Sequence, residues 1–435
     1  MLTAVFRHGA RTPVTNWLNF QWANDIGIGN LTFGGMRQHY FLGAQIQQNY
    51  SKLLGPQTYN NFALQVYSSP ILRTIQSAHS HLHGMFRPGV DPQVDDPNVG
   101  FGPDITSAVY VPPSTPFTYN FNQQKAVPYG FGMFPVATDT AFLNLYFTVD
   151  QSCPNFASLV STARKDFDPT YDKLIQPTCD KLQALGYTPS QFGQTTCNLA
   201  MIDAAYDCLI ADRFYNGKNG AGLSDAFYNE LTIAKSINSV LGFPTDQTVN
   251  LFTNNISRSI VDGMNDKMAG KTNLTYRIFS GHDTTLLPLM MQLELISLAC
   301  LKNIYPGGSD PNCNTHPPYA SSLLFELVTD PNSNYFVRIL YNGQPVSPIC
   351  ANPVDTFYCD VDSFKTEWNK RMYLKNFLQI CGNEYYTVSS LRSSLVVLIV
   401  GVGLASLAGA ILVVQYALSY SKLSKRWAKV QQITV

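Results

Sequence analysis

Seven residues close to the amino terminus combine a nucleophile with two fixed positive charges. Residues 7–13 read Arg-His-Gly-Ala-Arg-Thr-Pro. An imidazole nitrogen of His8 can attack phosphorus, and the planar guanidinium groups of Arg7 and Arg11 match phosphoryl oxygens bidentately. Gly9 removes a side chain and is expected to let the backbone approach the ligand closely. The combination predicts a site that handles phosphoryl groups.

The elements expected around this segment bring further polar groups to the same place. Residues 2–6 are apolar and predict a buried strand, so His8 follows a strand's carboxyl end, where open α/β sheets bind ligands. His282 and Asp283 follow a second expected strand, residues 275–280. A bound phosphate would raise the pKa of Asp283 and keep it protonated, as an acid for the leaving group. Taken alone, the same residues would also fit an ordinary helix cap.

A third arginine is expected at the start of a helix. From Ile71 the apolar positions step by 4, 3, 4 and 3 residues, which indicates one face of an amphipathic helix. Arg73 therefore lies where its side chain and the helix dipole can both meet an anion. His79 and His83 have i, i+4 spacing on this helix, but no Cys, Asp or Glu nearby in sequence completes a zinc site, so no metal is expected.

These segments resemble the histidine phosphatase superfamily, in its branch of histidine acid phosphatases. The resemblance extends over about residues 1–385 and is weak between 100 and 260. It rests on Arg-His-Gly-x-Arg-x-Pro, on residues 31–43, on 68–85 with Arg73, on Ser-Gly-His-Asp-Thr-Thr at 280–285, and on 317–320. It implies a covalent phosphohistidine on His8, a general acid at Asp283, no cofactor, and a phosphoryl group held by Arg7, Arg11, Arg73 and His282.

The resemblance also implies the fold and its division into domains. We expect an α/β core with a mixed, mostly parallel sheet flanked by helices, formed by residues 1–95 and 260–385. Residues 96–259 are expected to form a smaller, inserted and mainly helical cap domain. Residues 322–328 and 335–341, separated by Thr-Asp-Pro-Asn-Ser-Asn, predict a hairpin.

Three functions are compatible with these motifs. An acid phosphatase acting on phosphate monoesters is favoured by His282-Asp283-Thr284, because a phytase or inositol-polyphosphate phosphatase usually carries His-Ala-Glu or another acid arrangement. A non-catalytic cell-surface binding protein on the same scaffold should have lost the nucleophile or an arginine, and none is missing. Lys+Arg and Asp+Glu both total 29, so no global basic field favours nucleic acid as a partner.

Cysteines and glycosylation signals indicate an oxidising compartment. The chain has nine cysteines, and four Asn-x-Ser/Thr signals stand at Asn30, Asn49, Asn255 and Asn273. The resemblance implies the disulfides Cys153–Cys381 and Cys350–Cys359. Cys300 and Cys313 are close enough in sequence for a third disulfide. The pairing of Cys179, Cys197 and Cys208 stays open.

A membrane anchor is predicted near the carboxyl terminus. Residues 395–418 carry no charged side chain over 24 positions. A helix of that length is about 36 Å long, enough for the roughly 30 Å hydrocarbon layer. We therefore predict a transmembrane helix at 393–420. The basic residues that follow it predict a cytoplasmic tail at 421–435.

This topology makes the chain a single-pass type I protein in contact with membrane lipid, at the cell surface or in lysosomes. Such a protein needs a signal peptide, and none precedes Arg7. We therefore expect this sequence to lack its true amino terminus. Homodimers are common in the resembling family, although no motif here predicts one.

Overall fold

The computed structural model describes residues 1–55, 62–86, 134–138, 146–147, 149, 153–217, 223–373 and 377–382. Residues 1–377 form one compact unit, and residues 378–435 belong to a second. No helix among the described residues has the length and apolar character needed to cross a bilayer. The predicted span at 393–420 and the tail at 421–435 lie outside the described residues.

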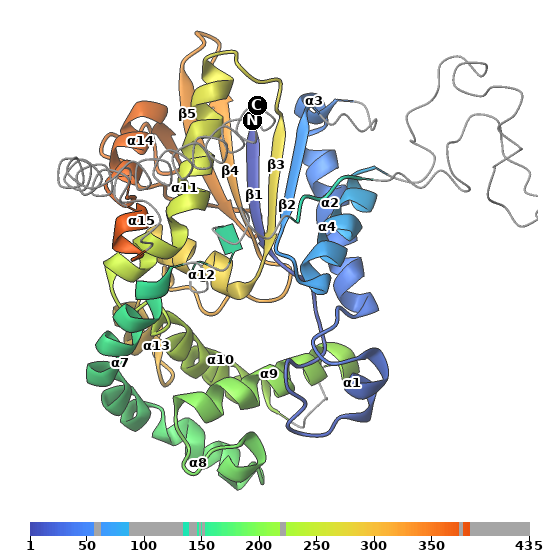
Figure 1. The fold of residues 1–435 in the computed structure, drawn as a ribbon, viewed down its shortest axis with the longest axis vertical. Coiled ribbons are helices and arrows are strands. Elements are labelled where there is room, and N and C mark those ends of the chain that lie inside the picture. Colours follow the sequence, from blue (N-terminus) through green and yellow to red (C-terminus); the bar gives the residue numbers. More distant parts are fainter. Residues whose placement is uncertain are drawn as a thin grey trace, which may run out of the picture. The chain divides into compact units, whose positions relative to one another are not determined.

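One mixed sheet forms the centre of the described unit (Figure 1). Its strand order is β2-β3-β1-β4-β5-β6, with β7 paired to β5. The strands are β1 (Leu2–Arg7), β2 (Leu64–Ser68), β3 (Tyr276–Gly281), β4 (Ser322–Thr329), β5 (Tyr335–Tyr341), β6 (Gln344–Val346) and β7 (Tyr358–Asp360).

The expectation of a mostly parallel sheet is wrong. Only β2, β3 and β1 run parallel to one another, and the pairings of β4, β5, β6 and β7 are antiparallel. Connection length accounts for the antiparallel pairing of β4 with β5. Parallel neighbours need a long crossover, whereas the short turn between β4 and β5 can join only antiparallel strands. The predicted hairpin at 322–341 is thereby confirmed.

Helices cover both faces of the sheet, as predicted. On one face α2 (Phe33–Asn49) and α4 (Leu72–Met85) close the main apolar cluster, where Leu82 and Met85 meet Phe6 of β1. On the other face Trp368 of α14 (Val361–Asn369) packs against Phe325 of β4, with ring centroids 5.8 Å apart. Further helices are α3 (Ser51–Leu54), α12 (Asp283–Gln292), α13 (Leu298–Ile304) and α15 (Phe377–Ile380). β1 is buried along its whole length, so the loop that follows it starts from a rigid base.

From residue 153 onward the cap region is mainly helical, whereas the described residues 134–138 are not helical, and Ala137 forms a bridge to Tyr67 of β2. Its helices are α7 (Pro154–Leu174), α8 (Gln176–Ala184), α9 (Leu199–Asn216), α10 (Asp225–Val240) and the 3₁₀ turn η2 (Pro189–Phe192). They lie together beyond the sheet end at which β1 and β3 stop (Figure 1). The predicted boundary at 259/260 falls inside α11 (Asp246–Met268), which runs from this layer along the sheet. Because a helix is a rigid rod, α11 joins cap and core rather than separating them.

A piece of the amino-terminal segment also packs on the cap. The Trp22 ring, on α1 (Gln21–Ile26), stacks on Tyr215 with centroids 4.1 Å apart and an interplanar angle of 8°. Its indole nitrogen donates to Asp212 at 3.1 Å. The segment after the Arg-His-Gly loop therefore anchors the loop to α9.

The disulfides settle part of the cysteine pattern. Cys350–Cys359 forms as the resemblance implied, and Cys300–Cys313 as predicted. Cys179 pairs with Cys197, which leaves Cys208 as a buried free thiol. Cys153 and Cys381 are each disulfide-bonded.

The four glycosylation signals differ in exposure. Asn49 and Asn273 are exposed, whereas Asn30 and Asn255 are partly buried. The Asn30 side chain also donates to the Ile26 carbonyl at 3.1 Å. The two exposed positions are therefore the better acceptors, and their glycosylation stays a prediction.

Candidate active site

His8 follows the end of β1 and is almost completely buried. His8 is 1% exposed, and its amide donates to the Gly281 carbonyl at the end of β3 at 3.0 Å. Its carbonyl accepts from the amide of Ala320 at 3.1 Å. The loop is thus tied to the end of β3 and to the segment just before β4, which fixes the position of the imidazole.

Gly9 is required by helix packing. A Cβ at Gly9 would lie 2.2 Å from the Gly35 carbonyl oxygen of α2, and a Cβ at Gly35 would lie 2.2 Å from the Ala10 carbonyl oxygen. Two backbones therefore touch where any side chain would push α2 away from the loop. This contact holds the loop that carries His8 against the core, and the expected approach of a ligand to Gly9 stays a prediction.

Side chains of α2 and α4 hold the same loop from behind. Gln38 accepts from the Ala10 amide at 2.8 Å, and Ser77 accepts from the Gly9 amide at 3.1 Å. The His39 Nε2 atom donates to the Arg7 carbonyl at 3.0 Å. The resemblance had indicated His39 as a packing residue near the site. Nothing in the spacing of Gln38 and Ser77 marks them as parts of a site, and only the packing of two helices against the loop reveals them.

The hydrogen bonds of His8 decide its tautomer. Its Nδ1 lies 2.8 Å from the Gly9 carbonyl oxygen. A carbonyl can only accept, so Nδ1 carries the hydrogen and Nε2 presents a lone pair when the ring is neutral. Burial, followed by the charges of Arg7 and Arg11, lowers the His8 pKa well below 6.5. The ring is therefore neutral at mildly acidic pH.

Three arginines converge beside His8. Arg7 and Arg11 are only 2% and 6% exposed, and Arg73 is half-buried. Within the described residues, the Nε atom of each of the three is buried and has no hydrogen-bond partner. Buried cationic donors are costly unless a negatively charged group satisfies them. This arrangement fits the binding of an anion with several oxygens.

An aromatic ring supports two of these cations. The Tyr319 ring lies under the guanidinium groups of Arg7 and Arg11, at 4.4 and 5.9 Å from its centroid. Such cation–π contacts stabilise a desolvated cation by about 2 kcal/mol. Tyr319 belongs to the Pro-Pro-Tyr-Ala string, whose resemblance drew attention to it without assigning a role.

His282 and Asp283 meet the arginines from the end of β3. The His282 ring lies 5.5 Å from that of His8, and its Nε2 contacts the Ser69 hydroxyl at 2.8 Å. Burial and the charge of Arg73 lower the His282 pKa to about 3, so this ring is also neutral. Asp283 accepts from the Thr284 amide at 2.8 Å through Oδ1, while Oδ2 faces the arginines. Asp283 is the first residue of α12, with His282 as the N-cap, and its role as a general acid stays a prediction.

Asp283 has a partner that the sequence did not reveal. Its Oδ2 lies 3.0 Å from Nη2 of Arg7 and 3.1 Å from Nε2 of His316. Burial alone would raise the Asp283 pKa, but Arg7 and His316 outweigh burial and hold that pKa well below 3.8. His316 precedes the Pro-Pro-Tyr-Ala string, and only the fold brings it to α12. Within the described ranges, no group of His, Cys, Asp and Glu side chains is arranged to hold a metal ion.

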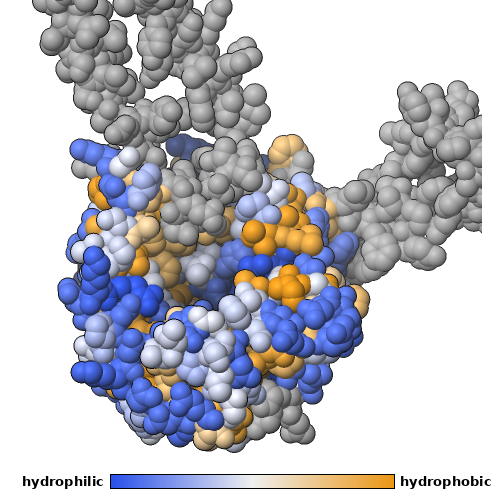
Figure 2. All heavy atoms as spheres, turned by 60° about the horizontal axis from the view of Figure 1, so that its bottom comes forward, coloured by the Kyte–Doolittle hydropathy of each residue, from blue (hydrophilic) through white to orange (hydrophobic). Residues whose placement is uncertain are grey.

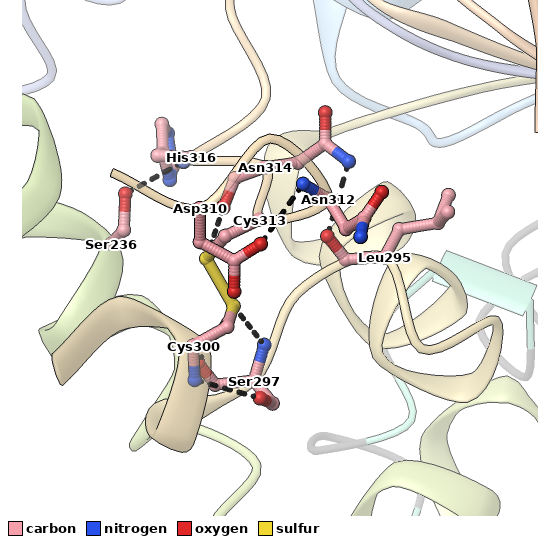
Figure 3. Close-up of a disulfide and its surroundings, with 9 residues drawn as sticks. All are labelled: Ser236, Leu295, Ser297, Cys300, Asp310, Asn312, Cys313, Asn314 and His316. Atoms are coloured by element: carbon pink, nitrogen blue, oxygen red, sulfur yellow. Dashed lines mark hydrogen bonds between the residues drawn. A yellow bond between two sulfur atoms is a disulfide. The ribbon is translucent and has the colours of Figure 1, made fainter. Parts of the chain in front are cut away.

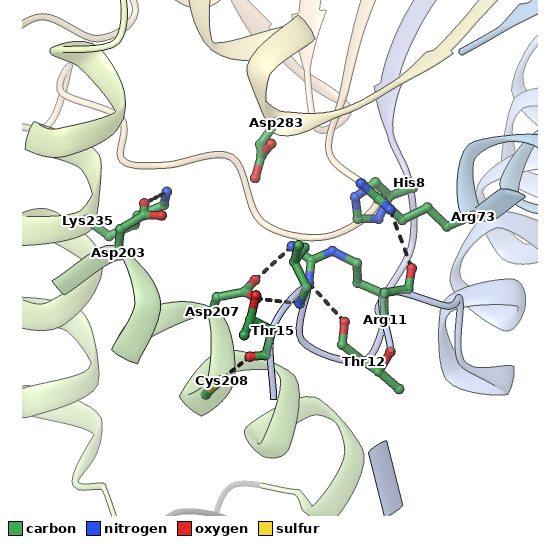
Figure 4. Close-up of polar contacts among 12 residues, drawn as sticks. His8, Arg11, Thr12, Thr15, Arg73, Asp203, Asp207, Cys208, Lys235 and Asp283 are labelled. Atoms are coloured by element: carbon green, nitrogen blue, oxygen red, sulfur yellow. Dashed lines mark hydrogen bonds and ion pairs between the residues drawn. The ribbon is translucent and has the colours of Figure 1, made fainter. Parts of the chain in front are cut away.

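The cap contributes charged groups to the opposite wall (Figure 4). Asp207 of α9 accepts from Arg11 Nη2 at 2.7 Å and from the Val14 amide at 2.7 Å. Lys235 of α10 pairs with Asp203 of α9. Figure 2 shows the hollow between the two layers, with hydrophilic surface at its centre.

Residues 1–342 match the family model of the histidine phosphatase superfamily (branch 2). The chain belongs to this superfamily. Members are catalytic, so the expectation of an enzyme is confirmed and that of a non-catalytic binding protein loses its basis.

Curated relatives and solved structures agree with this membership. The chain is 24% identical over 368 residues to the lysosomal acid phosphatase of Xenopus laevis, covering 81% of this chain and 72% of the relative. It is 25% identical to the prostatic acid phosphatase of Homo sapiens, covering 79% and 77%. The phytase of Hafnia alvei in complex with tartrate shares the fold, with a TM-score of 0.59, 12% identity, and coverage of 86% and 96%.

Proposed function

We propose that this chain is an acid phosphatase that hydrolyses phosphate monoesters through a phosphohistidine on His8. One observation carries the proposal: the Nε2 lone pair of a neutral His8 stands among three arginines whose Nε atoms have no partner within the described residues. A nucleophile, a tetrahedral anion site and a carboxyl group are the parts that two-step phosphoryl transfer requires. Relatives named acid phosphatases support the same activity.

In the first step, Nε2 of His8 attacks phosphorus and the bond to the ester oxygen breaks. Arg7, Arg11 and Arg73, with His282, hold the equatorial oxygens and stabilise the charge that spreads over them. The guanidinium groups are positioned beforehand, so little reorganisation accompanies the reaction. The released alkoxide takes a proton from Asp283.

In the second step, water attacks the phosphorus and the P–N bond breaks. Asp283, now a carboxylate, accepts the water's proton, and inorganic phosphate leaves a neutral His8. For the first step Asp283 must be protonated, although Arg7 favours its ionised form. A phosphoryl group bound to Arg7 competes for that guanidinium and adds negative charge, and both effects raise the Asp283 pKa.

Trapping of the intermediate tests the proposal. The chain is mixed briefly with ³²P-labelled phosphate monoester and quenched in alkali, in which phosphohistidine survives. We expect label on His8, and none in His8→Ala. Turnover of p-nitrophenyl phosphate without label on any histidine would overturn the phosphohistidine mechanism.

A phytase activity is the alternative that the solved relatives raise. Their identity to this chain is 12–15%, so they support the fold alone. Lys235 in the cap is paired with Asp203, and Asp207 adds a further carboxylate close to Arg11. Among these cap residues, a hexakisphosphate would find no cation that is not already paired with a carboxylate. Comparing phytate with a simple alkyl phosphate distinguishes the two functions, and we expect the alkyl phosphate to be preferred.

We also propose that the phosphatase domain acts outside the cytosol, on a lysosomal or secretory route, and is anchored at residues 393–420. The disulfides and the relatives named lysosomal acid phosphatases support this route. Alkaline carbonate extraction and protease protection of vesicles test the anchor. Release of the chain by carbonate would contradict the span, and digestion of the phosphatase domain in intact vesicles would contradict the topology.

A further inference from the structure

The segment that carries His316 is fixed from several sides (Figure 3). The Cys300–Cys313 disulfide ties it to α13, and Asn314 donates to the Leu295 carbonyl through both its amide and its side chain, at 3.0 and 3.1 Å. The His316 amide donates to the Ser236 hydroxyl at 2.7 Å. The imidazole, 3% exposed, therefore has a defined orientation between cap and core.

The neighbours of His316 determine which of its ring nitrogens always carries a hydrogen. The Ser239 hydroxyl donates to the Lys235 carbonyl at 2.9 Å, which uses its single hydrogen. The same oxygen lies 3.1 Å from His316 Nδ1 and can then only accept. Nδ1 therefore carries a hydrogen in every protonation state, and Nε2 is the nitrogen that gains or loses a proton.

Nε2 stands between a donor and an acceptor. Arg7 Nη1 lies 3.3 Å away and also donates to the Pro317 carbonyl at 2.6 Å. Asp283 Oδ2 lies 3.1 Å away. An ionised carboxylate and a bare imidazole nitrogen can both only accept, so this contact becomes a hydrogen bond only when a proton lies between them. Asp283 and His316 are thus placed to hold one proton jointly.

We infer that His316 is the positioning and proton-holding partner of Asp283, so that the proton given to the leaving alcohol is stored on the pair. The inference rests on the proposed function. In the first step the pair's proton passes from Oδ2 to the ester oxygen as the P–O bond breaks, which leaves a carboxylate and a neutral imidazole. In the second step the attacking water returns one proton to the pair as the P–N bond breaks.

The charges around His316 explain when the pair of Asp283 and His316 holds a proton. Burial, with Lys235 and Arg7, lowers the His316 pKa to about 4, while Asp283 acts in the opposite direction. Asp203 neutralises Lys235, and the Tyr206 ring packs edge-on at 5.7 Å. A phosphoryl group that binds Arg7 weakens the effect of the main core charge that lowers the pKa values of the pair. It also adds a negative charge beside them. Proton affinity of both partners therefore rises when substrate binds.

His316→Gln in the full chain tests the inference, because glutamine keeps a donor beside Asp283 but cannot hold a titrating proton. We expect kcat for an alkyl ester, 2-phosphoglycerol, to fall about 100-fold, within the usual range for losing acid catalysis. For p-nitrophenyl phosphate, whose leaving group needs no proton, kcat should change less than about threefold. The basic limb of the pH profile for the alkyl ester should move to lower pH.

A purely structural role makes a different prediction. Parallel losses for both substrates, with an unmoved basic limb, would overturn the inference. His79→Gln on α4 is the matched control, and His316→Asn repeats the test if the glutamine variant does not fold. Failure of the proposed function is separately visible, because the wild-type chain would then form no phosphohistidine. Normal labelling with an unchanged pH profile in His316→Gln would reject only the role of His316.

Discussion

The core and cap walls of the site differ in how their charges are balanced. On the core wall, Arg7 and Arg73 present buried guanidinium nitrogens that have no partner among the described residues. On the cap wall, Lys235 is paired with Asp203, and Asp207 is paired with a core arginine, Arg11. Asp283 pairs with Arg7, and the core wall still carries more positive than negative charge, whereas the cap wall is close to neutral.

The difference separates binding of the phosphoryl group from recognition of the rest of the substrate. A phosphoryl group needs fixed cations, and the core supplies them from strand ends and a helix start that cannot move independently. The leaving group meets the cap, whose paired charges offer little attraction to further phosphates. Substrate preference should therefore depend on the cap, and rate on the core.

Removing the core nucleophile should have the largest effect. We expect His8→Ala to lower kcat by at least about 10⁴-fold, as loss of a catalytic nucleophile usually does. Hydrolysis of p-nitrophenyl phosphate measures the effect, with His79→Ala as the histidine control on the same fold. Activity within tenfold of wild type would remove His8 from the mechanism.

Removing the acid should have a smaller and substrate-dependent effect. Asp283→Ala is expected to lower kcat for alkyl phosphates by about 10²- to 10⁴-fold, the range for general acid catalysis. The loss should be smallest for esters whose alcohols are themselves acidic. Measuring kcat for a series of leaving groups tests this, and an equal loss across the series would contradict a proton-donor role.

As the pH falls, the core should lose stability at a higher pH than the cap. All seven histidines lie outside residues 96–259, and burial lowers the pKa of His39 to about 4 and that of His81 to about 3. The unfolded chain, with pKa values near 6.5, then binds more protons, so the free energy of unfolding falls as the pH drops below about 6.5. At pH 5 His81 alone should cost about 2 kcal/mol relative to pH 7.

His81→Gln can keep the contact with Tyr276 but does not titrate, so the difference in Tm between pH 7 and pH 5 should shrink. Hydrogen exchange at pH 5 should show opening in β1 and α4 before α9 and α10. A cap that opens first, or an unchanged difference in Tm, would contradict the assignment of acid sensitivity to the core.

Changing the cap charge should have the smallest effect. Asp207→Asn keeps an acceptor for Arg11 but removes the negative charge. We expect inorganic phosphate to inhibit roughly tenfold more strongly, about 1.4 kcal/mol, because Arg11 is no longer neutralised. The inhibition constant measures this, with Asp225→Asn, at the exposed start of α10, as control. Weaker inhibition would show that Asp207 mainly positions Arg11.

Sequence reasoning could name the proposed phosphoryl-binding residues because they lie in short strings next to strand and helix ends. Arg7, His8 and Arg11 lie within five positions, and Arg73 is the second residue of α4, so local structure alone places them at the sheet end. The sheet was expected to be mostly parallel, and the antiparallel pairings of β4, β5, β6 and β7 contradict this, although the hairpin itself was recognised. His316, Asp207 and Gln38 gave no signal, because their partners are distant in sequence.

The sequence by itself determined the family, the loop that carries the proposed nucleophile, the strands next to it and most of the cation set, because these depend on residue type and local spacing. Only the tertiary structure decided the tautomer of His8, the close backbone contact that requires Gly9, the pairing of cap charges and the position of His316 beside Asp283. Those features depend on distances between segments up to about 300 residues apart. No local pattern encodes such distances; they arise from how helices and strands pack.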